Sequence, residues 1–280
     1  MQGDEVVLPH NAPPAWTAWV PMSDGGCRNN GTVDNSTLLN TGPVSWVLLA
    51  VLLVLAATLW RAALGRRFRD MVLGGLRALV QLAVVALVIT QLAGHPGLAL
   101  LFVLLMFAVA TWTSGHRIAR RGRWWAAAIP IAAGAFPIGA LMFVTGVLPW
   151  NALALVAVLG QQIGGAMATT TLSGRRVEDE LAGRRGEVEA AVALGFQWPA
   201  ARLMVARPVA GEAVLPSLDQ TRTAGTVTLP GAFVGLILGG ASPLDAGLIQ
   251  LLVLISLLAV NTTAAWVTMR LGCRGLWHRR

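Results

Sequence analysis

Charged residues with regular spacing gather in one run of the sequence, residues 187–208, which reads EVEAAVALGFQWPAARLMVARP. Glu187 and Glu189 stand at its start, where carboxylates stabilise the positive N-terminal end of a helix. Gly195 permits the positive φ with which many helices end, and Pro199 suits the first turn of a following helix. The run therefore predicts a short helix, a turn at Gly195 and a second helix.

No other set of residues has the spacing of a catalytic or metal site. The sequence has no GxSxG or HExxH motif and no convincing pair of catalytic carboxylates within its apolar stretches. The usual transition-metal ligands are scattered over loops and tails, at His10, His95, His116, His278, Cys27 and Cys273. We expect no metal site built from His and Cys, and no enzyme activity in this chain.

Lysine is absent from the sequence, and all 21 basic residues are arginine. A P-loop needs a Lys that reaches the β- and γ-phosphates of a nucleotide. The longest segment between the apolar stretches, residues 173–208, is also too short for a nucleotide-binding domain. We therefore expect no cofactor in this chain, and we expect any ATP and Mg²⁺ to be bound by a separate ATPase.

The composition is that of a membrane protein, with 55% hydrophobic and 12% charged residues. Apolar stretches of about 20 residues recur, which predicts an all-α integral membrane protein with about seven transmembrane helices. The predicted spans are 43–60, 71–92, 97–114, 124–145, 151–172, 209–240 and 246–269. The sixth stretch is long and contains Pro216 and Pro230, so we expect a bent or interrupted helix there.

The arginines orient this arrangement. With the N-terminus outside, nearly every Arg falls in a cytoplasmic loop or in the C-terminal tail, whereas Arg28 lies outside. This asymmetry follows the positive-inside rule, and it explains the net charge of +8 without nucleic-acid binding. We expect a protein of the plasma (inner) membrane with its N-terminus outside and its C-terminus inside. Its parts are a polar extracytoplasmic tail (1–42), a transmembrane domain (43–270) with a cytoplasmic loop (173–208), and a basic cytoplasmic tail (271–280).

Glu189, Ala190 and Ala191, followed by Gly195 and later by Pro208, form the pattern EAAxxxG with a closing proline. This pattern resembles the EAA loop of ABC-transporter permeases, which lies in the cytoplasm and docks into a groove on a separate P-loop ATPase subunit. The resemblance implies an ATPase-coupling loop that includes Glu187, Glu189, Ala190, Ala191, Gly195, Pro199, Arg202 and Pro208. An amphipathic helix lying on the membrane surface is the alternative interpretation.

Four ordered blocks extend the resemblance over residues 70–270: RALVQL, GQQIGGAM, LPSLDQTRTAGTVTLPG, and GASPLDA followed by Gln250. Together they resemble the FetB-type permeases associated with iron export, a family with plant relatives implicated in aluminium tolerance. The chain departs from that family at Gly165, where an Asn is expected, and at Ala232 and Phe233, where a Met pair is usual. Arg222 stands where Lys is common. Because thioether sulfurs are plausible soft-metal ligands, the missing methionines leave the substrate open.

Polar residues within the predicted spans are candidates for a translocation path or gate, namely Arg77, Gln81, Gln161, Gln162, Met167, Asp219 and Arg222. Arg77 and Gln81 are one helical turn apart, although Arg77 could instead snorkel to the membrane surface. Each Gln could equally hydrogen-bond between helices. Asp219 and Arg222 can pair near the cytoplasmic end of the sixth span as a gate or latch. Gly231, Gly235 and Gly239 recur every four residues and predict close helix packing.

The resulting hypothesis is an ABC permease subunit that exports metal ions such as iron, as the resemblance implies. Since a pair of ATPase subunits needs two coupling loops, we expect a homodimer in the lipid bilayer. Two alternatives remain. One is an ATP-independent secondary transporter or channel, and the other is a non-transporting membrane scaffold coupled to an ATPase.

Overall fold

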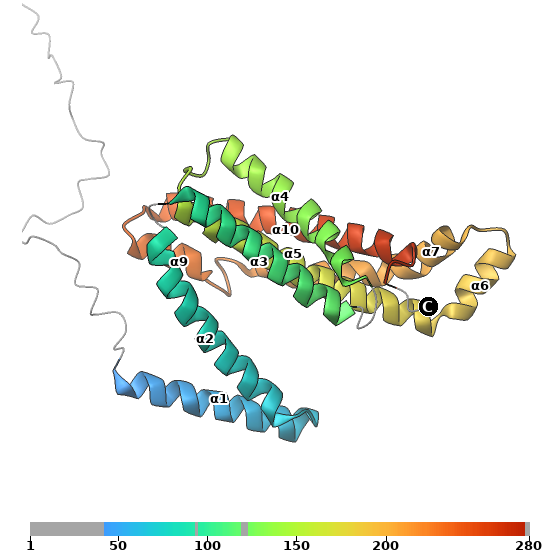
Figure 1. Ribbon diagram of the computed structural model, residues 1–280, viewed down its shortest axis with the longest axis horizontal. Coiled ribbons are helices and arrows are strands. Elements are labelled where there is room, and N and C mark those ends of the chain that lie inside the picture. Colours follow the sequence, from blue (N-terminus) through green and yellow to red (C-terminus); the bar gives the residue numbers. More distant parts are fainter. Residues whose placement is uncertain (1–41, 93–94, 119–122, 278–280) are drawn as a thin grey trace, which may run out of the picture. The chain divides into compact units, whose positions relative to one another are not determined.

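The computed structural model describes residues 42–92, 95–118 and 123–277, and this part of the chain is helical (Figure 1). The elements are α1 (Pro43–Leu64), α2 (Phe68–Leu92), α3 (Pro96–Ile118), η3 (Trp124–Ala127), α4 (Ala128–Val144), α5 (Ala152–Gly183), α6 (Arg185–Ala193), α7 (Trp198–Gly211), η4 (Glu212–Val214), α8 (Leu215–Thr223), α9 (Gly231–Leu238) and α10 (Pro243–Cys273). The predicted extracytoplasmic tail lies outside the described residues, except for Gly42. The chain divides into two compact units, residues 1–79 and 80–280, and each is described by itself.

Among the described residues, six helices are long and apolar enough to cross a membrane: α1, residues 68–89 of α2, α3, the stretch of η3 and α4, α5 and α10. The protein is therefore a multi-pass, all-α membrane protein. The sixth predicted span, residues 209–240, is not one helix. It contains the end of α7, then η4, α8, a loop over 224–230 and α9. The predicted interruption is confirmed, with Pro216 in the first turn of α8 and Pro230 as the N-cap of α9.

In the second unit, α3, α5 and α10 run in the same direction. Thr171 of α5 donates a hydrogen bond of 3.0 Å to Ser114 of α3, and Gly160 lies against Met106 earlier on both helices. Gly165 of α5 lies against Leu257 and Asn261 of α10. Further along both helices, Val177 lies against Gly272. Residue numbers thus increase together along all three helices, and these helices end at the same end of the bundle.

Helix α4 runs in the opposite direction. The preceding turn η3 lies against the end of α3, where the backbone of Gly115 approaches Trp124, and earlier on α3 the Phe107 ring packs at a tilt against Phe136 of α4, with 5.2 Å between the ring centroids. Buried Ala, Val, Ile and Leu side chains of α3, α4, α5 and α10 form one core, in which Ile131 and Val260 are fully buried. The four helices therefore form the rigid part of this unit (Figure 1).

We call the end at which α3, α5 and α10 finish the basic end, because it carries Arg117, Arg175, Arg176, Arg270 and Arg274. Two helices at this end extend past predicted boundaries. Helix α5 does not stop at residue 172 but continues to Gly183, since its backbone hydrogen bonding continues after the apolar stretch ends. The predicted basic tail begins inside α10, and Trp277 is buried with Ala126, Ala127 and Leu271. Arg279 and Arg280 lie outside the described residues.

Candidate functional site

Residues 185–211 form the predicted pair of helices. Helix α6 covers Arg185–Ala193, Gly195 adopts φ +96°, and α7 begins at Trp198 with Pro199 in its first turn. A positive φ is readily accessible only to glycine, so Gly195 is what lets the chain turn between the two helices. One detail differs from the expectation. Pro208 does not close the stretch but lies inside α7, which continues to Gly211.

Ion pairs fix the start of α6. Arg184 donates to Glu187 from Nε at 2.6 Å and reaches Glu180 of α5 at 3.2 Å, while Arg185 contacts Glu189 at 2.8 Å. The hydrogen bond from Arg184 lowers the pKa of Glu187 below its ordinary value, and the same bond raises the pKa of Arg184. Glu187 and Glu189, two residues of the predicted coupling loop, therefore lie in exposed intrachain ion pairs, and Arg184 links the end of α5 to the start of α6.

The inner faces of α6 and α7 pack on the bundle. Val188 of α6 and Ala201, Val205 and Ala206 of α7 are buried together with Val177 and Leu181 of α5 and Met269 and Cys273 of α10. Ala191 is partly buried against the same cluster, and Arg202 stacks on the Trp198 ring at 5.8 Å. Arg176 of α5 forms an ion pair with Glu212 just after α7. A force on α6 or α7 would therefore act directly on the ends of α5 and α10.

The outer side of the turn carries exposed apolar side chains that sequence reasoning missed. Leu194 is 81% exposed, and Phe196 and Trp198 are about half exposed. All three surround Gly195 within a segment otherwise rich in charge. The signal that could have found them is the run LGFQW, because large apolar residues in a surface turn are unexplained by folding of the chain itself. We call Leu194, Phe196 and Trp198 the apolar tip.

Beyond α7, residues 215–238 form what we call the broken segment, which contains α8, the loop 224–230 and α9. It follows α10 in the opposite direction. Near the middle of α10, the amide nitrogen of Asn261 donates a hydrogen bond of 2.5 Å to the Ser217 hydroxyl. Later in the segment, Phe233 lies beside Gly247, near the start of α10. The broken segment thus runs along α10 from the middle of that helix toward its start, away from the basic end.

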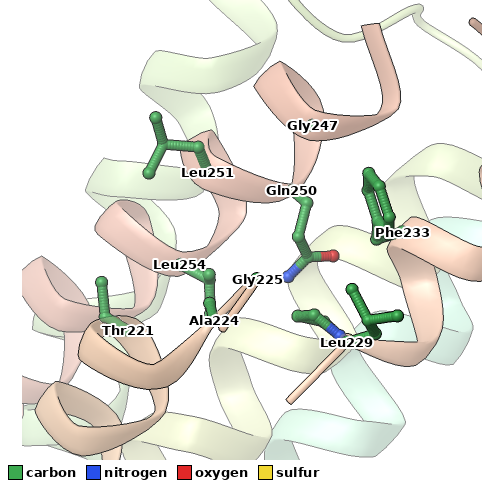
Figure 2. A pocket seen from close by; sticks show the side chains of 10 residues that line it. Thr221, Ala224, Gly225, Leu229, Phe233, Gly247, Gln250, Leu251 and Leu254 are labelled. Atoms are coloured by element: carbon green, nitrogen blue, oxygen red, sulfur yellow. The ribbon is translucent and has the colours of Figure 1, made fainter. Parts of the chain in front are cut away.

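A cavity of about 220 Å³ lies between the broken segment and α10. Figure 2 shows the Gln250 carboxamide among the lining residues, between Gly225 and Phe233. Gln250 is only 6% exposed, and its Oε1 has no hydrogen-bond partner among the described residues. A buried amide oxygen without a partner is costly, so this cavity is a polar position in otherwise apolar surroundings. The sequence analysis noted Gln250 only as part of a family block.

Asp219 and Arg222 form the predicted pair, with 3.8 Å between Oδ1 and Nη1. Their depth differs from the expectation. They lie on α8 between Ser217, which contacts Asn261, and Ala224, which lines the cavity with Gln250 and Leu254. The pair is therefore level with the middle of α10, not with its basic end, because α8 is a short separate helix that starts one turn before the pair.

The candidates on α5 do not meet at one place. Gln162 is 1% exposed, and its amide nitrogen donates to the Met142 sulfur of α4 at 3.1 Å, which suits an interhelical contact. Gln161 is exposed on the other side of α5, and Met167 packs partly against the core. Arg77 and Gln81 lie on α2, and both are exposed. Their roles in transport remain predictions.

The glycine face predicted for close packing has open space around it within the described chain. Nothing lies within 4 Å of a Cβ added at Gly231 or Gly235, and Gly239 meets only its own helix backbone. Close helix contacts instead occur at Gly134, Gly139 and Gly165. Packing through Gly231, Gly235 and Gly239 therefore remains a prediction for contact with another molecule.

Within the described ranges, no three His, Cys, Asp or Glu side chains are grouped so that they could hold a metal ion. The buried polar side chains of the described residues are uncharged amides and hydroxyls, such as Gln162, Thr170, Gln250 and Asn261. Two features are therefore candidates for function: the helix pair with its exposed apolar tip, and the broken segment with its charged pair and cavity.

Comparison with known proteins decides the family. The model of the uncharacterised protein family UPF0014 matches residues 43–277, which include the helix pair and the broken segment. The chain belongs to the UPF0014 family. No solved structure matches it.

Relatives of this UPF0014 chain come from plants and bacteria. The UPF0014 membrane protein STAR2 of Oryza sativa subsp. japonica is 34% identical over 193 residues, covering 68% of this chain and 67% of STAR2. Protein ALUMINUM SENSITIVE 3 of Arabidopsis thaliana is 30% identical, covering 70% and 73%. The probable iron export permease protein FetB of Escherichia coli K12 is 25% identical, covering 73% and 80%. The resemblance drawn from the sequence blocks to the FetB-type family is thereby confirmed.

Proposed function

We propose that this UPF0014 chain is the membrane subunit of an ABC transporter and that a separate P-loop ATPase docks on α6 and α7. The observation that carries the proposal is the helix pair itself. Two short helices joined at Gly195 expose the apolar tip outward while their inner faces pack on α5 and α10. The relationship to a protein named a probable iron export permease supports the same function.

In this proposal the part of the chain that holds the broken segment crosses the membrane as the sixth of seven spans. Helices α5 and α10 run in the same direction, so the chain must return to the opposite end between Gly183 and Pro243. The contacts of Ser217 with Asn261 and of Phe233 with Gly247 support that return along α10. Seven crossings put the N-terminus and the C-terminus on opposite sides.

The arginines give the orientation. Because α3, α5 and α10 all end at the basic end, the positive-inside rule assigns this end to the cytoplasm and the N-terminus to the outside of the plasma (inner) membrane. The apolar tip then faces the cytoplasm, where an ATPase with its ATP and Mg²⁺ would be available. A surface-lying amphipathic helix fits less well, since the apolar side of this helix pair is already packed on the bundle.

We further propose that two copies of the chain form the transporter, because each ATPase subunit of a pair needs its own coupling loop. By relationship to the probable iron export permease, the transported substrate is a metal ion and the direction is export. Motion of the ATPases would pass through α6 and α7 to α5 and α10 as a rigid-body displacement.

The test is capture of the ATPase from native membranes. Tagged wild-type protein is compared with the double variant Leu194→Glu/Phe196→Glu, and bound P-loop ATPase is scored by mass spectrometry. We expect recovery with wild type and at least a tenfold loss with the variant, because charges would enter an apolar contact. The control is Leu244→Glu, whose leucine is 82% exposed at the start of α10, far along the chain from the tip.

An ATPase recovered equally with wild type and the double variant would contradict docking at the apolar tip. No ATPase with any of the three proteins would favour the ATP-independent transporter or channel.

A further inference from the structure

Two charged side chains of the broken segment remain uncovered by the chain. Asp219 is 66% exposed and Arg222 is 67% exposed, and their single contact is 3.8 Å long. A guanidinium offers five N–H donors, and a carboxylate accepts several hydrogen bonds. The contact between Asp219 and Arg222 therefore leaves most of their hydrogen-bonding capacity to the surroundings.

These side chains lie at the depth of the membrane interior. Between Asp245 and Arg270, α10 has 24 uncharged residues, 246–269, whose middle is near residue 257. At 1.5 Å per residue this stretch is roughly 36 Å long, enough to cross the hydrocarbon core. Asp219 and Arg222 lie between Ser217, which bonds to Asn261, and Ala224, which shares the cavity with Gln250. They are therefore level with the middle of that stretch.

The backbone of the broken segment is also uncovered at this depth. No residue of α8 or α9 is fully buried, and Gly225, Thr226, Val227 and Thr228 of the loop are exposed. The N–H groups of residues 225–228 donate within the loop, to the carbonyl oxygens of Thr223 and Thr228, so its other carbonyl groups are what the surroundings must satisfy. Irregular backbone within a bilayer occurs only where protein covers it or where it lines a water-filled cavity, because hydrocarbon cannot satisfy such groups. Charged side chains obey the same limit.

The cavity beside the loop adds an independent indication. The Gln250 carboxamide projects into it from α10, and its oxygen has no partner within the described part of the chain (Figure 2). The Gln250 carboxamide is thus a polar group in the wall of the cavity. By contrast, the outward residues of α10 at similar depth, such as Leu248 and Ile255, are exposed and apolar, as expected for contact with lipid.

We propose that the broken segment lines a water-filled path through the membrane, with Asp219, Arg222 and the loop hydroxyls facing the water. This inference rests on the proposed transport function, because that function is what the path would serve. The opposite charges of Asp219 and Arg222 and the uncharged Gln250 make the path polar without giving it one strong sign.

Reactivity of single cysteines tests the path. In a Cys27→Ser/Cys273→Ala background, Arg222→Cys and Thr226→Cys are compared with Ile255→Cys, an exposed apolar position of α10 at the same level. Membrane vesicles that contain the protein without an ATPase are treated with methanethiosulfonate ethyltrimethylammonium, a charged reagent, on both sides. We expect cysteines at 222 and 226 to react at least tenfold faster than the cysteine at 255, since a thiolate forms only in contact with water. Thr226→Cys keeps the ion pair, so its result stands even if Arg222→Cys does not fold.

Equal, slow reaction at positions 226 and 255 would overturn the proposal, because position 226 would then have no contact with water. Equal, fast reaction would also overturn it, because position 255 would then lie outside the hydrocarbon. The assay needs neither ATP nor a partner. Fast reaction at positions 222 and 226 without ATPase capture would contradict only the ATP-driven function. ATPase capture with slow reaction at these positions would contradict only this inference.

Discussion

At the residue scale, glycines show where the helices come closest. A Cβ added at Gly134 of α4 would lie 2.8 Å from the carbonyl oxygen of Val260 in α10. A backbone atom cannot move aside as a flexible side chain can, so the two helices would have to separate. Gly134 is thus required by packing, whereas Gly231 and Gly235 have open space in the described chain.

We predict that Gly134→Ala destabilises the protein by about 1–3 kcal/mol, the usual cost of forcing an extra carbon into a packed interface. The melting temperature of the detergent-solubilised protein should fall by several degrees. Gly164→Ala is the matched control, because Gly164 is a helical glycine of α5 with nothing within 4 Å of the added carbon. The control should melt at or above the wild-type temperature, since Ala favours helix over Gly. Equal melting of both variants would contradict the packing of α4 on α10.

The sequence predicts residues well where their role is local. Gly195, Pro199 and the ion pair of Asp219 with Arg222 depend on near neighbours in the chain, and the structure has all three as expected. It predicts poorly where the role depends on distant contacts. Gln161 and Gln162 are adjacent and alike in sequence, yet one is exposed and the other is fully buried against Met142.

At the element scale, the helix pair was predictable and the length of α5 was not. A hydropathy window ends where the apolar run ends, near residue 172, but helix formation depends on backbone hydrogen bonds and on pairs such as Glu180 with Arg184. The same reasoning applies to Pro208, which costs α7 one hydrogen bond at an exposed position and does not end the helix.

We predict that Gly195→Ala weakens the coupling element without disturbing the bundle. Holding an alanine at φ +96° costs roughly 1–3 kcal/mol, so the turn should shift and ATPase recovery from membranes should fall severalfold. Gly186→Ala is the matched control, because Gly186 lies in α6 with open space around it. Unchanged ATPase recovery with Gly195→Ala would show that the geometry of this turn is not needed for docking.

At the scale of the whole molecule, the seven-span prediction already has stretches 151–172 and 246–269 running in the same direction, as α5 and α10 do. The course of the chain between these two helices is what the sequence does not show. Helices α8 and α9 have 9 and 8 residues, so each is only about 12–14 Å long and too short to cross a membrane alone. By hydropathy these residues belong to one apolar stretch. In the structure they are two separate helices that lie along α10. This course supports the odd number of crossings that the arginines predict.

The most direct test of the account is photocrosslinking from the apolar tip. p-Benzoylphenylalanine is placed at position 196 between α6 and α7, and separately at the exposed position 244 of α10, and native membranes are irradiated. We predict a covalent adduct with a P-loop ATPase from position 196 and none from position 244. The absence of an ATPase adduct at 196, or an equal yield at both positions, would contradict a permease driven through α6 and α7.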